Sequence, residues 1–164
     1  MTKAKVGKAQ SSIPALELTK PNVALIGFAG TSRHLAPYDD QTWECWSLNE
    51  AHRQPWMKRL TRWFQIHQKW DWQKMNNESY REHREWLTKD HPFPIYMLEK
   101  YSEVPSSVRY PLEDVIAKLV PNVKRGDAVN EYFTSSFAWM CALALYLGPP
   151  KKIGVWGFEM ATDT

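Results

Sequence analysis

The stretch VALIGFAGTS, residues 23–32, decides the fold class of this chain. Its first six residues form a continuous apolar run, which the turn residues Pro21 and Asn22 precede. A run of this kind is typical of a strand that is buried on both faces, as in a parallel sheet. The small residues at 29–32 then predict a tight loop at the carboxyl end of that strand.

Four further segments predict strands of the same kind, and helical segments separate them. The expected strands are 43–48 (WECWSL), 63–67 (WFQIH), 94–97 (PIYM) and 153–156 (IGVW). The expected helices are 50–60, 77–89 with Asn77 as its cap, 111–119, and 134–148 with a Gly-Pro-Pro stop. Strands that alternate with helices predict an α/β fold. We expect a single Rossmann-like domain with a mainly parallel sheet of about five strands and helices on both faces.

The domain is expected to span residues 21–164, behind a flexible basic arm at residues 1–20. The arm holds four lysines against Glu17 and therefore carries the whole net charge of +3, because the remaining 17 basic and 17 acidic residues cancel. This balance disfavours a nucleic-acid partner, except through the arm. The chain ends eight residues after the last expected strand, inside a loop of the ligand edge, which favours a truncated domain over a naturally minimal one.

Composition excludes several other classes of protein. Aromatic residues make up 13% of the 164 residues, which argues against intrinsic disorder. The longest apolar run, 137–147, is shorter than the roughly 20 residues that a membrane-spanning helix needs, and it predicts a core helix. Cys45 and Cys141 stand among apolar residues without metal-ligand spacing, which favours buried thiols and a cytoplasmic protein.

Ligands of open α/β sheets bind at the carboxyl ends of the strands, so the residues that follow each expected strand are the site candidates. Small residues let backbone amides approach a phosphate, and hydroxyls at a helix N-terminus suit an anion. The candidate nucleotide-binding residues are Gly27, Ala29, Gly30, Thr31, Asn49, Thr134, Ser135, Ser136 and Glu159. The candidate catalytic residues are His67, as a base, and Arg109, which would offset the charge of a leaving group.

Each candidate also has an ordinary structural alternative. The glycines at 27–30 match only part of a GxGxxG pattern and no GK[ST] follows them, so a plain strand–helix turn is equally compatible. Asn49 and the serines at 135 and 136 are typical helix caps. His67 stands among aromatic residues, as packed histidines do, and Arg109 is equally compatible with a surface ion pair. The tryptophans of 43–72 suit core packing better than stacking on bases.

Two pairs of motifs carry a resemblance to a known family. VALIGFAGTS is followed by WECWSLNEAH, and near the C-terminus stands YFTSSFAWMCALALYLGPPKKIGVWGFEMA. Together they resemble the bacterial sialyltransferases of glycosyltransferase family 42, in the first strand and its loop, in a second strand that ends in Asn, and in the Thr-Ser-Gly helix with the strand that follows it. The resemblance covers roughly residues 22–52 and 132–161. The chain as a whole also resembles small uncharacterised proteins of bacteriophages.

The resemblance implies that the loop at 27–30, Asn49, Thr134 and Ser135 contact the nucleotide of a CMP-sugar. It also implies transfer of the sugar to a hydroxyl acceptor without a required metal or other cofactor. We therefore expect a glycosyltransferase-like domain that binds a nucleotide or nucleotide-sugar, in the host cytoplasm if a phage encodes it. The alternatives are a non-catalytic protein that binds or sequesters a nucleotide, and a structural or assembly protein with a Trp-rich surface.

The chain also departs from the family pattern at several positions. Phe28 stands where the family has a polar Asn, and Ser136 replaces the Gly of Thr-Ser-Gly. Glu159 replaces Asp, and Ala161 stands near a family Tyr that contacts the leaving phosphate. The position of the family's catalytic His falls beyond residue 164. The sequence therefore favours a nucleotide-binding scaffold over catalysis, and it leaves the base, the sugar, the acceptor and the oligomeric state open.

Overall fold

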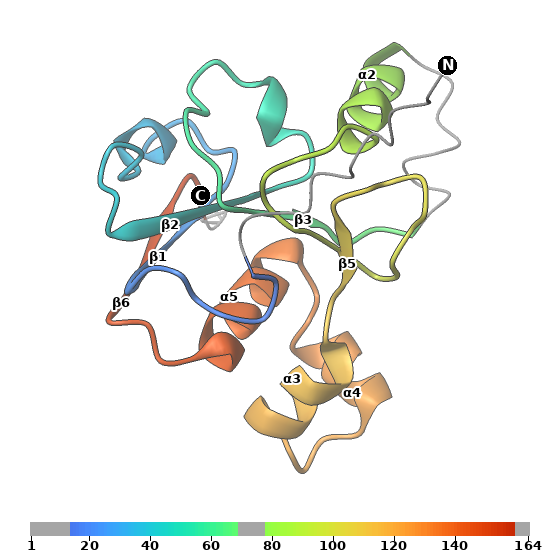
Figure 1. Cartoon of the computed structure of the whole chain (residues 1–164). Helices are drawn as coiled ribbons and strands as arrows, with labels where there is room; N and C mark the ends of the chain where they lie inside the picture. Colours follow the sequence, from blue (N-terminus) through green and yellow to red (C-terminus); the bar gives the residue numbers. More distant parts are fainter. Residues whose placement is uncertain (1–13, 69–77, 160–164) are drawn as a thin grey trace, which may run out of the picture.

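A computed structural model describes residues 14–68 and 78–159 and has an α/β fold with one parallel sheet (Figure 1). The sheet has six strands in the order β5-β4-β3-β2-β1-β6. The strands are β1 (Asn22–Ile26), β2 (Trp43–Leu48), β3 (Arg62–Gln65), β4 (Ile95–Met97), β5 (Ser107–Arg109) and β6 (Lys152–Trp156). The expectation of a single Rossmann-like domain is confirmed.

Helices cover both faces of the sheet, with α2 on one side and α3, α4 and α5 together on the other (Figure 1). The α-helices are α2 (Glu78–Leu87), α3 (Leu112–Leu119), α4 (Arg125–Glu131) and α5 (Ser136–Leu147), and the short 3-10 helices are η1 (Arg33–Leu35) and η2 (Ala51–Arg53). Among the described residues, no helix is both long and apolar enough to cross a bilayer.

Alternation along the strands divides the core into two sides. Val23 and Leu25 of β1 face α5 and are fully buried, while Ala24 and Ile26 face the opposite side. The register places Trp46 of β2 beside Leu25, so the same face continues across the sheet. Strands that are apolar on both faces read as continuous hydrophobic runs, which is why 23–28 identified the parallel sheet.

The structure corrects one expected element and adds two that were not expected. The helix expected at 50–60 is only the three-residue η2, because Pro55 and the turns around it break the helical hydrogen bonds. The strand β5 and the helix α4 were not expected, since three residues and seven residues leave almost no periodic signal. The expected Asn77 cap, and Trp70 and Trp72 of the Trp-rich segment, lie outside the described residues, whereas Trp46 and Trp63 are fully buried in the core.

The last part of the expected basic arm is held against the sheet. Arg62 at the start of β3 is fully buried and pairs with Glu44 of β2, at 2.6 Å from Nε to Oε2. The guanidinium also donates to the carbonyl oxygens of Pro14 (2.9 Å) and Ala15 (3.1 Å), and to that of Glu17. A buried charge requires a partner for each polar group, and residues 14–17 supply them. Residues 14–19 therefore cover the amino ends of β2 and β3.

The order in which strands are added to the sheet changes direction at β1. β2 and the three strands beyond it lie on one side of β1, and β6 lies on the other. In open α/β sheets the crevice for ligands forms outside the carboxyl ends of the strands, so this end of the molecule is where a site is expected.

Candidate functional site

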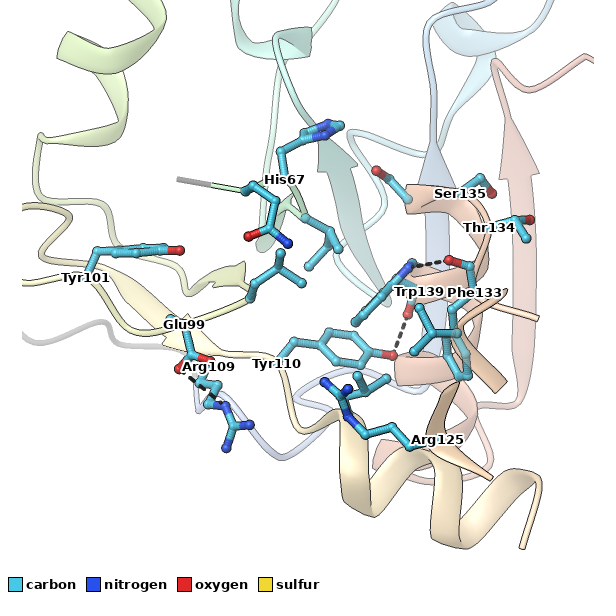
Figure 2. Close-up of a pocket in the computed structure, with 16 residues that line it drawn as sticks. His67, Glu99, Tyr101, Arg109, Tyr110, Arg125, Phe133, Thr134, Ser135 and Trp139 are labelled. Atoms are coloured by element: carbon cyan, nitrogen blue, oxygen red, sulfur yellow. Dashed lines mark hydrogen bonds and ion pairs between the residues drawn. The ribbon is translucent and has the colours of Figure 1, made fainter. Parts of the chain in front are cut away.

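A pocket of about 610 Å³ opens at the carboxyl ends of β3, β4 and β5, on the side of the sheet that α3, α4 and α5 cover (Figure 2). Residues that directly follow the three strands form one wall, and the start of α5 forms the opposite wall. The lining residues are Ile66, His67, Gln68, Leu98, Glu99, Tyr101, Arg109, Tyr110, Leu112, Arg125, Val129, Phe133, Thr134, Ser135, Ser136 and Trp139.

Aromatic side chains fix the inner wall of the pocket. The Tyr110 hydroxyl donates to the Trp139 carbonyl oxygen at 2.9 Å, and the Trp139 indole N–H donates to the Phe133 carbonyl oxygen at 2.9 Å (Figure 2). The rings of Tyr110 and Trp139 meet edge to face, with centroids 4.7 Å apart. Burial raises the pKa of Tyr110 well above its usual range, so the hydroxyl stays protonated and keeps donating. This wall is therefore rigid and apolar, with its polar atoms already satisfied.

The start of α5 brings hydroxyls and helix amides to the pocket. Ser135 is the N-cap, in an extended conformation, and its Oγ accepts a hydrogen bond from the Ala138 amide at 3.3 Å. The capping alternative for Ser135 is thus confirmed. The first amides of an α-helix have no carbonyl partner within the helix, and the helix dipole makes its N-terminus attractive to an anion. Thr134 and Ser136 flank the cap and also line the pocket.

His67 and Asn49 form a hydrogen-bonded pair at the ends of β3 and β2. His67 Nε2 lies 3.1 Å from Asn49 Oδ1. Asn49 is the only described non-glycine residue with a positive φ, at 52°, and its amide donates to the Phe64 carbonyl oxygen at 2.9 Å. Asn tolerates this left-handed conformation, and η2 shows no side-chain cap, so capping is not the role of Asn49. An amide oxygen at Nε2 favours the tautomer in which Nδ1 of His67 accepts a proton.

Charged side chains stand at the mouth of the pocket. Arg109 pairs with Glu99 (3.5 Å) and with Glu113 (3.2 Å), and Arg125 pairs with Glu113 (3.5 Å). All four side chains are at least half exposed. Exposed ion pairs of this kind are worth about 0–1 kcal/mol, so each arginine can exchange a carboxylate for a bound anion at little cost. Arg109 therefore forms the surface ion pair of the alternative interpretation, and it also lines the pocket.

The loops after β1 and β6 pack against each other and leave Gly27, Ala29, Gly30, Thr31 and Glu159 outside the pocket wall. The amides of Gly27 and Ala29 donate to the carbonyl oxygens of Trp156 (2.8 Å) and Gly157 (2.7 Å). A Cβ on Gly27 would stand 2.4 Å from the Gly157 oxygen, so this glycine serves the approach of two chain segments. Thr31 donates to Glu159, and Gly30 is exposed with open space around it. The turn alternative therefore describes Gly27, and the segment that follows this loop forms only the three-residue η1.

Two further histidines, His52 and His83, lie together on the other face of the sheet and support the loop that carries Asn49. His52 Nε2 lies 2.8 Å from His83 Nδ1, and His83 Nε2 lies 3.0 Å from Gln65 Oε1. Burial lowers the pKa of His52 to about 3 and that of His83 to about 4, and positive neighbours, Arg53 among them, add to both effects. Both rings are therefore neutral at pH 7. The pair joins η2 to α2 and to the end of β3.

The structure thus brings together five of the predicted site residues, and a hydrogen bond joins a sixth. His67, Arg109, Thr134, Ser135 and Ser136 line the pocket, and Asn49 contacts it through His67. The sequence reasoning missed Arg125, because α4 was not expected, and it assigned Trp139 to the core alone. In the described part of the chain, no group of three or more His, Cys, Asp or Glu side chains is arranged to hold a metal ion.

Comparisons of the chain with protein-family models, with curated proteins and with solved structures found no match. The fold and the pocket therefore define the class by themselves. This is a Rossmann-like α/β domain with a pocket at the carboxyl edge of its sheet.

Proposed function

We propose that this pocket binds a nucleotide or nucleotide-sugar, of the CMP-sugar type that the sequence resemblance implies. The observation that carries the proposal is the convergence of His67, Arg109 and the hydroxyls at 134–136 on one pocket at the carboxyl edge of a parallel sheet. Small-molecule sites in open α/β folds form at this edge. A volume of about 610 Å³ is within the range of about 300–1,000 Å³ that is typical of ligand pockets.

The chemistry of the walls suits a ligand with an anionic part and an apolar, flat part. The phosphate would approach the N-terminus of α5 and would replace Glu113 as the ion-pair partner of Arg125. Tyr101 and the rigid wall of Tyr110 and Trp139 offer aromatic surface for a base or sugar. The loop of Gly27 and Ala29 takes no part, because their amides bond within the protein.

Sugar transfer from such a ligand would use His67 as the base. In that step the acceptor hydroxyl gives its proton to Nδ1 of His67 while its oxygen forms a bond to the anomeric carbon. The bond from that carbon to the phosphate oxygen breaks, and the nucleotide leaves with the electron pair. Asn49 would hold the imidazole in the accepting tautomer through the 3.1 Å hydrogen bond. Arg125 and Arg109 would offset the charge of the leaving phosphate.

A thermal-shift panel of CMP, UMP, GMP, ADP, NAD and several nucleotide-sugars tests binding. A ligand at 100 times its Kd stabilises the fold by about 2.7 kcal/mol, which for this size of protein raises Tm by about 5–10 °C. We expect Arg125→Ala to weaken binding about tenfold, because a charge-assisted hydrogen bond is lost. Arg81→Ala on α2 is the matched control, since it removes a similarly exposed arginine from the far side of the sheet. The absence of any nucleotide response would refute the proposal.

Turnover is tested separately, by release of free CMP from a CMP-sugar with and without a hydroxyl acceptor. We expect His67→Ala to abolish release while the thermal shift by CMP persists. Binding without release in the wild-type protein would support the non-catalytic alternative, and equal release by His67→Ala would exclude His67 as the base.

A further inference from the structure

The outer edge of β6 is an unpaired strand edge within the described residues. β6 stands last in the sheet, beside β1. The Gly27 amide donates to the Trp156 carbonyl oxygen, so the backbone groups of Trp156 point toward β1. Backbone groups of successive strand residues point to opposite edges, so those of Gly154 also point toward β1. The N–H and C=O groups of Ile153 and Val155 then point outward, as a template for another strand.

An apolar surface lies beside this open edge. Ile153 is 37% exposed and Val155 is 47% exposed, although their neighbours across the ladder, Val23 and Leu25, are fully buried under α5. The helix α5, SFAWMCALALYL, contains no charged residue, and Leu145 is 49% exposed on its outer side. The other side chains of α5 are buried or half-buried, as is typical of a helix that is apolar all round, so Leu145 is its exposed apolar side chain.

We call the outer edge of β6, together with the flank of α5 that carries Phe137, the β6–α5 face. Phe137 of α5 packs on Phe158, just after β6, with ring centroids 4.3 Å apart. This contact places the first turn of α5 against the residue two positions after β6, while the body of the helix packs on β1 and β3. Cys141, one helical turn after Phe137, is half-buried on the same flank. Unpaired backbone and uncharged side chains thus meet on the same side of the molecule.

We propose that the β6–α5 face binds a second copy of this chain, through antiparallel pairing of the two β6 strands about a two-fold axis at Gly154. In this register Ile153 of each copy stands opposite Val155 of the other. Both residues have outward backbone groups, so each of these pairs exchanges both of its hydrogen bonds. A shift by two residues would leave one outward residue of each strand opposite a residue outside β6. The register about Gly154 is therefore the one that uses the whole strand.

The side chains and charges of β6 are complementary to themselves in this register. Ile153 and Val155 form apolar cross-strand pairs on the α5 side of the sheet. On the other side Lys152 stands opposite Trp156 of the second copy, a pairing of a cation with an aromatic ring. The lysines at 151 and 152 of the two copies lie at opposite ends of the ladder, so like charges do not meet. A two-fold axis normal to the sheet also places both α5 helices on the same side of the joined sheet.

Sedimentation equilibrium of the full chain, from about 1 µM to about 1 mM, tests the proposal. We expect a transition from 19.2 kDa to twice that mass. Val155→Lys places a charge on the edge of each copy and should raise the dimer Kd at least about tenfold. Tyr132→Lys is the matched control, because it changes a side chain of similar exposure, 51%, at the C-terminal cap of α4. A 19.2 kDa species at every concentration, or a dimer that Val155→Lys leaves unchanged, would overturn the proposal.

Amide hydrogen exchange in the wild-type protein tests the register without any variant. The amides of Gly154 and Trp156 bond to β1 and should be protected at low and high concentration. The amides of Ile153 and Val155 should exchange fast at low concentration and become protected as the dimer forms. Concentration-dependent mass without protection of these two amides would place the interface elsewhere and refute the β6 pairing. Neither readout depends on nucleotide binding.

Discussion

Replacing Glu44 by Gln tests whether the buried ion pair controls the stability of the fold. Glu44 and Arg62 are fully buried and joined by hydrogen bonds of 2.6 and 3.2 Å. Glu44 also accepts from the amide and hydroxyl of Thr19 (2.6 and 2.9 Å) and from the indole N–H of Trp46 (2.7 Å). Glu44→Gln keeps the shape but leaves the charge of Arg62 uncompensated, which costs about 3–5 kcal/mol when the pair is buried.

That cost is a large share of the roughly 5–15 kcal/mol by which domains are stable. With a slope of about 2 kcal/mol per molar urea, the unfolding midpoint should fall by about 2 M. Urea titration followed by far-ultraviolet circular dichroism measures this shift. Glu113→Gln is the control, since Glu113 pairs with arginines at the surface, and we expect a change below about 0.5 kcal/mol. An equally small change in Glu44→Gln would refute the reasoning.

The pH dependence of the same pair gives a second readout. Burial by itself raises the pKa of Glu44, but the hydrogen bonds and charge of Arg62, with the Thr19 and Trp46 donors, outweigh it and hold the pKa below its ordinary value of 4.5. A depressed carboxyl pKa stabilises the fold above pH 4.5, and this stabilisation is lost as the pH falls through the folded-state value. Glu44→Gln should lack this acid-induced loss. A double variant, Glu44→Leu with Arg62→Met, should recover part of the stability, because it leaves no unpaired charge, although the donors of Thr19 and Trp46 lose their acceptor.

Three further predictions concern the loops and the polar core. Gly27→Ala should lower the free energy of unfolding by about 1–3 kcal/mol, since its Cβ meets the facing carbonyl oxygen at 2.4 Å, whereas Gly30→Ala should be tolerated; thermal melts compare the two, and equal Tm values would contradict the packing argument. The free energy of unfolding should fall as the pH falls from about 6.5 toward 4, because the lowered pKa values of His52 and His83 mean that protons bind the unfolded chain first. Urea titrations at pH 5 and 7 should show a smaller loss of stability in His52→Phe than in the wild-type protein, and an equal loss would exclude the pair as its source. Tyr110→Phe removes the 2.9 Å bond to the Trp139 carbonyl and should cost about 0.5–1.5 kcal/mol in a urea titration, with a neutral result showing that water replaces the hydroxyl.

Local sequence predicted the elements whose signal is long and periodic. The apolar run at 23–28 predicted the doubly buried strand β1, and the helix expected over 134–148 corresponds to α5, whose N-cap is Ser135. The three-residue β5 could not be predicted in the same way. Its pairing with β4 is what makes it a strand, and that partner is tertiary. The expected helix at 50–60 was wrong because Pro55 and the turns beside it outweigh the helix-forming residues around them.

The residues of the site were likewise predicted in part from the sequence and in part decided by the tertiary structure. The sequence alone placed His67, Arg109 and the hydroxyls at 134–136 at the carboxyl edge, because strand ends of a parallel sheet converge there. Only the tertiary structure decided which of them share a pocket, and it separated them from the glycine loop, whose amides bond to residues more than 100 positions away. The tertiary structure likewise decided that residues 14–19 pack against the sheet, where Arg62 donates hydrogen bonds to their carbonyl oxygens. Local patterns record burial and turn preference, whereas the partner of each polar atom is set by long-range packing, and that packing separates a pocket from a turn.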